Sequence, residues 1–156
     1  MTIENLRRVL EEHAFFRGMK PEFLELLAGC AKNVVFATDE LLFREGDPAD
    51  EFYLIREGRV ALHLEGPGSP ISIQTCGDGD GVGWSWLVGP PPHQWQYTAR
   101  AVKDVRAIAI DGACLRKKCE QNYELGYEVL KRVAGVMAER LGATRLQLMD
   151  LYAPKA

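Results

Sequence analysis

The sequence predicts a mainly β domain with helices at both ends, in which short strands form a sandwich or barrel. Three observations predict this fold class. Residues 1–32 show helical spacing of apolar side chains, residues 33–110 hold short β-rich runs, and residues 111–156 return to helical spacing. A chain of 156 residues is long enough to bury a core as one domain. We therefore expect a single domain, 1–156, with these three parts.

The N-terminal part is expected to form two helices. Thr2 is a suitable N-cap for the first, and His13 near its end would place a cation at the negative end of the helix dipole. The second begins at Pro21, because proline is favoured in the first turn of a helix. Apolar side chains then lie on one side of it: Phe23, Leu26, Leu27 and Cys30.

Short strands are expected from about Asn33 onward. The runs "NVVFA", "ELLFREG", "EFYLIREGRVALHLEG" and "PISIQTCG" are separated by Gly, Pro and Asp. "REGR" is expected to turn a hairpin, because Gly58 can adopt a positive φ. "RAVKDVRAIAID" adds another strand pair, turned at Lys103 and Asp104. Several short strands at regular spacing indicate a sandwich or a barrel.

Two helices are expected at the C-terminal end. Asp111 can cap a short one, and Asn122 can cap a much longer one that runs to about Tyr152. The long helix carries a heptad-like seam at spacings of four and three: Leu130, Ala134, Met137, Leu141, Thr144, Leu148 and Leu151. Such a seam is compatible with packing on the chain's own barrel and with pairing to a second copy.

Composition and motifs argue against several classes of function. A net charge of −3 gives no electrostatic case for nucleic acid or an anionic membrane. No apolar run approaches the roughly 18 residues of a spanning helix, and no secretory leader opens the chain, so a cytoplasmic location is expected. The sequence holds no catalytic triad, paired carboxylates or phosphate loop, so we expect no enzymatic activity and no catalytic residues.

The four cysteines are expected to be free, buried thiols in a reducing compartment. Their spacing matches neither a zinc knuckle nor a redox pair: Cys30, Cys76, Cys114 and Cys119. Cys114 and Cys119 are five apart on a helix and therefore lie well off one face, which argues against a shared metal ion. No metal site is expected.

One stretch of the chain resembles the cyclic nucleotide-binding domain family. "LLFREGDPADEFYLIREGRVAL" is similar to the family's run of a hydrophobic strand, a glycine, an acidic turn, a second strand and a second glycine, here Gly46 and Gly58. The resemblance extends from about residue 10 to 152. It implies a double-stranded β-helix, or jelly roll, with a long C-terminal helix and a regulatory, ligand-sensing role. Apolar residues of this run can supply the barrel interior: Phe43, Phe52, Leu54, Val60 and Leu62.

The family's phosphate-binding segment corresponds to "GVGWSWLVGPPPHQWQYTARAV", residues 81–102. The usual pattern is Gly-Glu-Leu, followed some ten residues later by Arg-Ala; the glutamate binds the ribose and the arginine binds the phosphate. The resemblance places Gly83 on the family glycine, Trp84 on the glutamate, and Trp95 on or near the arginine. Both charged contacts are therefore missing. Prolines 90–92 also remove three amide donors.

Three interpretations of this divergent pocket stay open. Its candidate residues are Gly83, Trp84, Ser85, Trp86, Trp95 and Arg100. The tryptophans could fill the pocket, which would make the protein a ligand-free dimerisation or scaffolding module. They could instead line a pocket for an apolar or aromatic molecule. Alternatively, a cyclic nucleotide could bind through nonstandard contacts, with Ser85 and nearby amides as an anion nest and Arg100 in place of the missing arginine. The interpretation that we favour is a sensor module that does not bind cyclic AMP in the usual way.

The resemblance also implies a homodimer that pairs along the final helix. The expected interface residues are Leu130, Ala134, Met137, Leu141 and Leu148. Transcription factors of this family continue from that helix into a DNA-binding domain, whereas this chain ends at Ala156. We therefore expect no direct DNA binding and an output through protein contacts, with a further protein partner as one route.

Overall fold

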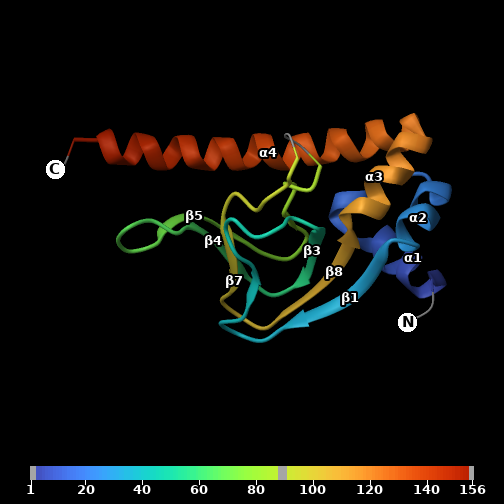
Figure 1. Cartoon of the computed structure of the whole chain (residues 1–156), viewed down its shortest axis with the longest axis horizontal. Coiled ribbons are helices and arrows are strands. Elements are labelled where there is room, and N and C mark those ends of the chain that lie inside the picture. The colour runs from blue at the N-terminus through green and yellow to red at the C-terminus, as the bar shows by residue number, and fades with distance from the viewer. Residues whose placement is uncertain (1–2, 88–90, 155–156) are drawn as a thin grey trace.

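Two antiparallel sheets of four strands each form the centre of the molecule in the computed structural model, which describes residues 3–87 and 91–154 (Figure 1). The first sheet has the order β1 (Ala31–Phe36), β8 (Val105–Asp111), β3 (Glu51–Glu57) and β6 (Gly81–Val82). The second has the order β2 (Leu41–Phe43), β7 (Thr98–Ala101), β4 (Val60–Leu64) and β5 (Ile71–Cys76). The predicted mainly β jelly roll with flanking helices is confirmed.

Helices cover one end of the sheets and cross the barrel. The N-terminal ones are α1 (Ile3–Glu12), the 3-10 turn η1 (Ala14–Phe16) and α2 (Pro21–Ala28). The C-terminal ones are α3 (Gly112–Gln121) and α4 (Tyr123–Tyr152). Figure 1 shows α4 running the length of the molecule above the barrel, with its C-terminal half over the β4–β5 hairpin. Thr2, expected as an N-cap, and Pro90 lie outside the described residues.

The barrel interior contains the apolar residues expected there. Side chains of the predicted set are all buried: Phe43, Phe52, Leu54, Val60 and Leu62. Strand β8 contributes a run of buried residues, 107–110, and lies between β1 and β3 in the first sheet. Sandwich cores of this kind supply most of the stabilisation of a small domain by removing apolar surface from water.

The turn predicted at Gly58 is correct, but the hairpin is wrong. Gly58 has a φ of 121°, and a Cβ there would lie 2.5 Å from the Asp104 carbonyl oxygen. Yet β3 pairs with β6 and β8, while β4 pairs with β5 and β7. The turn at residues 103–104 likewise joins β7 and β8, which belong to different sheets. A turn signal indicates that the chain reverses direction; it does not say which sheet the next strand joins.

Two of the four cysteines form a disulfide, so the expectation of free thiols was wrong for them. Cys30 and Cys114 are bonded, whereas Cys76 is a free buried thiol and Cys119 is free and half-buried. Strands β1 and β8 pair with Ala31 opposite Ile110. This pairing brings Cys30, just before β1, close to Cys114, just after β8. The partners are 84 residues apart in sequence, so their spacing carried no signal of this bond.

The two C-terminal caps are confirmed. The Asp111 side chain accepts a hydrogen bond from the Cys114 amide at 2.7 Å, and the Asn122 side chain accepts one from the Leu125 amide at 3.1 Å. Each cap satisfies an amide that a helix N-terminus leaves without a partner. Pro21 likewise occupies the first turn of α2.

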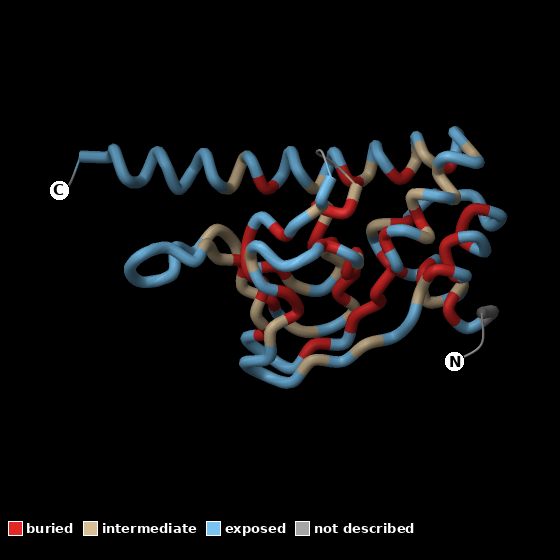
Figure 2. The backbone as a smooth tube through the Cα atoms, viewed as in Figure 1, coloured by how far each residue is buried: buried red, intermediate tan, exposed pale blue. Residues whose placement is uncertain are grey.

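Helix α4 buries one face against the barrel and leaves its seam exposed. Its buried residues are Leu125, Val129, Val133 and Arg140. The predicted interface residues are all exposed: Leu130, Ala134, Met137, Leu141 and Leu148. Figure 2 shows buried positions from the start to the middle of α4 and an exposed C-terminal end. The predicted interface residues therefore lie outside the core of the single chain. Within the described residues, no helix is both long and apolar enough to cross a membrane.

His13 is expected to make folding sensitive to acid. The structure buries it beyond the end of α1, where Nε2 lies 2.8 Å from the Ile55 carbonyl oxygen and Nδ1 accepts a hydrogen bond from the Phe15 amide. This arrangement needs the neutral ring, contrary to the cation expected at the helix end. Burial lowers the pKa of His13 below its ordinary value of 6.5.

Because the folded-state pKa lies below the unfolded one, protonation favours the unfolded chain. The stabilisation is full above about pH 6.5 and is lost as the pH falls below that value, by at most about 1.4 kcal/mol per pH unit. Urea unfolding measured at about pH 8 and about pH 5.5 tests this, with His13→Gln expected to show a shallower pH dependence. An equal pH dependence in the variant would assign the effect to other groups.

Candidate functional site

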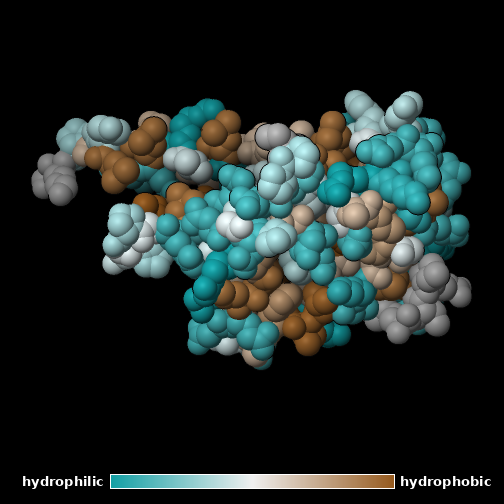
Figure 3. Space-filling model, viewed as in Figure 1, coloured by the Kyte–Doolittle hydropathy of each residue, from teal (hydrophilic) through white to brown (hydrophobic). Residues whose placement is uncertain are grey.

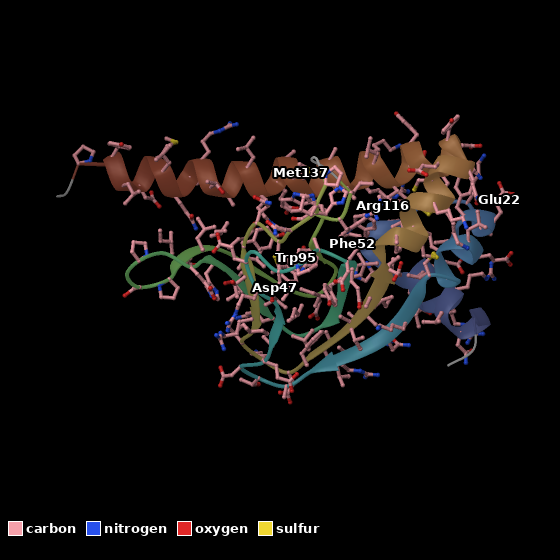
Figure 4. The ribbon with its side chains drawn as sticks, viewed as in Figure 1. Glu22, Asp47, Phe52, Trp95, Arg116 and Met137 are labelled. Carbon is pink, nitrogen blue, oxygen red and sulfur yellow. A yellow bond between two sulfur atoms is a disulfide. The ribbon has the colours of Figure 1, made fainter. Side chains whose placement is uncertain are left out.

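The segment that diverges from the family pattern is held at both ends by the barrel. Gly81 and Val82 form β6 and pair with β3, and residues 85–87 form a turn. At the far end, the Trp95 amide donates to the Asp47 carbonyl oxygen and the Gly46 amide donates to the Trp95 carbonyl oxygen, both at 2.9 Å. These bonds place the Trp95 side chain inside the barrel mouth, below Met137 of α4 (Figure 4).

Trp95 fills the space above Gly83. Its indole stacks on Phe43 with ring centroids 3.8 Å apart and an interplanar angle of 13°, and it is 3% exposed. A Cβ at Gly83, where φ is 91°, would lie 2.7 Å from the Trp95 ring. Only glycine therefore fits under this indole. The residue at the family's arginine position is thus part of the packed core.

Trp86 is a second tryptophan in the core, and the preceding residue, Ser85, is also buried. The Trp86 indole is 0% exposed; its Nε1 donates to the Gly83 carbonyl oxygen at 2.6 Å. Arg116 of α3, labelled in Figure 4, donates to the Trp86 carbonyl oxygen and ties this turn to the helical end. The buried Ser85 Oγ has no hydrogen-bond partner among the described residues.

Trp84 differs from the other two tryptophans because it is only half-buried. It meets Tyr97 edge-on, with ring centroids 5.8 Å apart. The Arg140 guanidinium carbon lies 4.7 Å from the centre of the Trp84 ring, within range of a cation–π interaction. The residue at the family's glutamate position therefore contacts α4 instead of filling the barrel.

Arg140 is the residue that sequence reasoning missed. It is only 7% exposed, and its guanidinium reaches from α4 to four neutral acceptors: Gln74 Oε1 at 3.2 Å, Tyr97 Oη at 3.1 Å, Cys76 Sγ at 3.3 Å and the Gly81 carbonyl oxygen at 3.2 Å. Burial raises the pKa of Tyr97 and of Cys76, and keeps both protonated at neutral pH. A signal was present in the sequence, since Arg140 lies seven residues after Val133 on the buried stripe.

Two cavities flank Arg140. The larger, of about 420 Å³, separates Trp84 and Tyr97 from α4, where Met137 and Leu141 line it. The smaller, of about 250 Å³, is lined on the barrel side by residues that include Asp80. In the described part of the chain, no three His, Cys, Asp or Glu side chains gather as a metal site.

Arg100 lies apart from this group. It is half-buried on β7 and donates to the Asp39 carbonyl oxygen at 2.8 Å. Its strand neighbours Ala99 and Ala101 point into the core, so the Arg100 side chain points to the other face of the sheet. The structure therefore brings together Gly83 with Trp86 and Trp95, and it sets Trp84 against Arg140.

The fold and this segment together define a cyclic nucleotide-binding regulatory domain. A profile of the family described as "Cyclic nucleotide-binding domain" matches residues 33–122, more than half of the chain. The chain belongs to this family.

Similar proteins agree with this assignment. A CRP-like cAMP-activated global transcriptional regulator of Mycobacterium tuberculosis is 28% identical over 144 residues, which cover 92% of this chain and 62% of the regulator. The chain thus spans less than two thirds of that relative. A protein assigned as cyclic nucleotide-binding from Geobacter metallireducens has a TM-score of 0.76 at 30% identity, with 90% of this chain and 98% of that one covered. The N-terminal domain of a Streptomyces coelicolor transcriptional regulator has a TM-score of 0.66 at 26% identity, with 86% and 94% covered.

Proposed function

We propose that this chain is a non-enzymatic sensor module that does not bind cyclic AMP through the family's usual charged contacts. The packing of Trp95 over Gly83 is the observation that carries the proposal. An indole stacked on Phe43 leaves no guanidinium for a phosphate at this position, and Trp84 offers no carboxylate to a ribose. Loss of the phosphate contact together with the sugar contact weakens binding by about a hundredfold or more.

The sensing part of the proposal is supported by the cavity beside α4. Met137 and Leu141 line this cavity and also belong to the exposed seam. A molecule bound there contacts the surface through which we propose that two copies pair. Because a ligand shifts an equilibrium only between states that it binds unequally, its contact with the seam can change dimer affinity. Figure 3 shows apolar side chains recurring along α4, as a pairing surface requires.

A second candidate function is a ligand-free dimerisation or scaffolding module. The burial of Trp86 and Trp95 favours it, because their indoles fill much of the barrel mouth. In either case, we expect no direct DNA binding by residues 1–156, since the net charge of −3 gives no attraction to phosphates. The cytoplasmic location stays a prediction.

Isothermal titration of cyclic AMP and cyclic GMP, up to about a millimolar ligand, tests the first proposal. We expect no saturable heat in the micromolar range for either nucleotide. Adenosine 5′-monophosphate is the control, because unspecific stacking of a purine on Trp84 would give similar heat for cyclic and linear nucleotides. Saturable micromolar heat from a cyclic nucleotide alone would contradict the expected loss of affinity and favour a receptor that binds the nucleotide through nonstandard contacts.

A further inference from the structure

Arg140 is a buried cation that no acidic side chain neutralises among the described residues. Its four hydrogen-bond acceptors are all neutral, and none of the ion pairs formed by the described residues includes it. A guanidinium has five N–H donors, so one on Nη1 has no acceptor within residues 3–87 and 91–154. Buried charges in proteins are normally paired, because an isolated one loses its hydration without compensation. An anion beside Arg140 would supply the negative charge that the described part of the chain does not place there.

The two cavities that flank Arg140 differ in charge. Asp80 and Glu139 line the smaller one, so an anion there would meet like charges. Among the described residues that line the larger cavity, none is acidic and Arg140 is the one charged group. An anion therefore favours the larger cavity.

The rest of the larger cavity is suited to an apolar body. Aromatic, aliphatic and hydroxyl side chains surround Arg140 there: Ile73, Trp84, Tyr97, Met137, Leu141 and Thr144. The Thr144 hydroxyl already donates to the Arg140 carbonyl oxygen at 3.0 Å. A volume of about 420 Å³ lies within the range of small-molecule sites, about 300–1,000 Å³.

We infer that Arg140 and the larger cavity form a binding site for a small organic anion with an aromatic or aliphatic body. This inference rests on the proposed sensor function. The acidic group pairs with the guanidinium, and the body lies between the half-buried Trp84 ring and α4. The site lies on the α4 side of Trp84, while Trp95 fills the barrel mouth. Its contacts are thus distinct from those that the family pattern gives to a nucleotide phosphate.

Two fluorescent dyes that differ by one charged group test this site on the full chain. Anilinonaphthalene sulfonate carries an anion on its aromatic rings, and N-phenylnaphthylamine has the same rings without it. We expect the anionic dye to bind at one site per chain, on the order of tenfold more tightly than the neutral dye. Arg140→Gln should abolish most of that difference. The matched control is Arg145→Gln, at an exposed position on the same helix, and it should leave the difference unchanged.

Equal affinity of the two dyes for the unaltered chain, or an equal loss of both in Arg140→Gln, would overturn the inference. If Arg140→Gln does not fold, Ala138→Trp replaces it, because this exposed position lines the cavity and a large side chain there fills it. Both dyes should then bind more weakly. Unchanged affinities in Ala138→Trp would place the dyes elsewhere and also overturn the site.

Competition with cyclic AMP separates this inference from the proposed function. Arg140-dependent displacement of the anionic dye by micromolar cyclic AMP would support the anion site and contradict the expected absence of micromolar cyclic AMP binding. If the dyes bind independently of Arg140, and titration with cyclic nucleotides also gives no heat, the anion site is overturned. The proposed function is not affected by that result.

Discussion

Replacement of Trp86 by alanine is expected to lower the free energy of unfolding by about 3–5 kcal/mol. The indole is fully buried, packs 5.9 Å from the Phe52 ring between centroids, and donates to the Gly83 carbonyl oxygen. Truncation removes these contacts and opens a cavity that the rigid barrel cannot close. The Gly83 carbonyl oxygen also loses its indole donor, which adds to the cost.

Urea unfolding followed by circular dichroism measures this loss. Trp84→Ala is the matched control, because its half-buried indole already faces a cavity and its removal should cost less. If Trp86→Ala lowers the free energy of unfolding no more than Trp84→Ala does, Trp86 does not stabilise the fold more than Trp84. This result would remove Trp86 as support for a tryptophan-filled barrel mouth and leave that interpretation to Trp95 alone.

Leu141→Asp is expected to convert the proposed dimer to a monomer, with the dissociation constant raised by at least about a hundredfold. The Leu141 side chain is 61% exposed in the single chain and lies in the middle of the seam. In a two-fold dimer each substitution occurs twice, so two carboxylates would be buried without partners. The stability of the single chain should change little, because Leu141 is outside its core.

Sedimentation equilibrium at tens of micromolar protein distinguishes the two states. Leu146→Asp is the matched control: it makes the same change on the same helix, at a side chain that is 65% exposed and lies on the opposite side of α4 from the seam. It should leave the dimer mass unchanged. A monomeric unaltered chain, or an unchanged mass for Leu141→Asp, would contradict pairing along this seam.

Local features of the fold could be predicted because they depend on neighbours in sequence. Asp111 and Asn122 each cap a helix through the amide three residues ahead, and Gly58 marks a turn through its own backbone freedom. The run around Gly46 and Gly58 also predicted the jelly roll by its resemblance to a family.

The candidate site was predicted only in part. The pattern placed Trp84 and Trp95 at the positions of the missing charged residues, but it left open whether each fills or lines the pocket. The structure gives the two tryptophans different surroundings: Trp95 is stacked on Phe43 in the core, and Trp84 borders a cavity. Burial depends on all the elements around a side chain, so a sequence pattern cannot assign it one residue at a time.

The sequence by itself determined where helices begin, where the chain turns and which residues can form a barrel core. Tertiary structure alone decided which sheet each strand joins, that Cys30 meets Cys114, and that Arg140 enters a site built by Trp84 and Tyr97. The physical reason is distance along the chain. Caps and turns act over a few residues, whereas the disulfide and the Arg140–Tyr97 contact link residues more than 40 apart in sequence and form only when the sheets and α4 have packed.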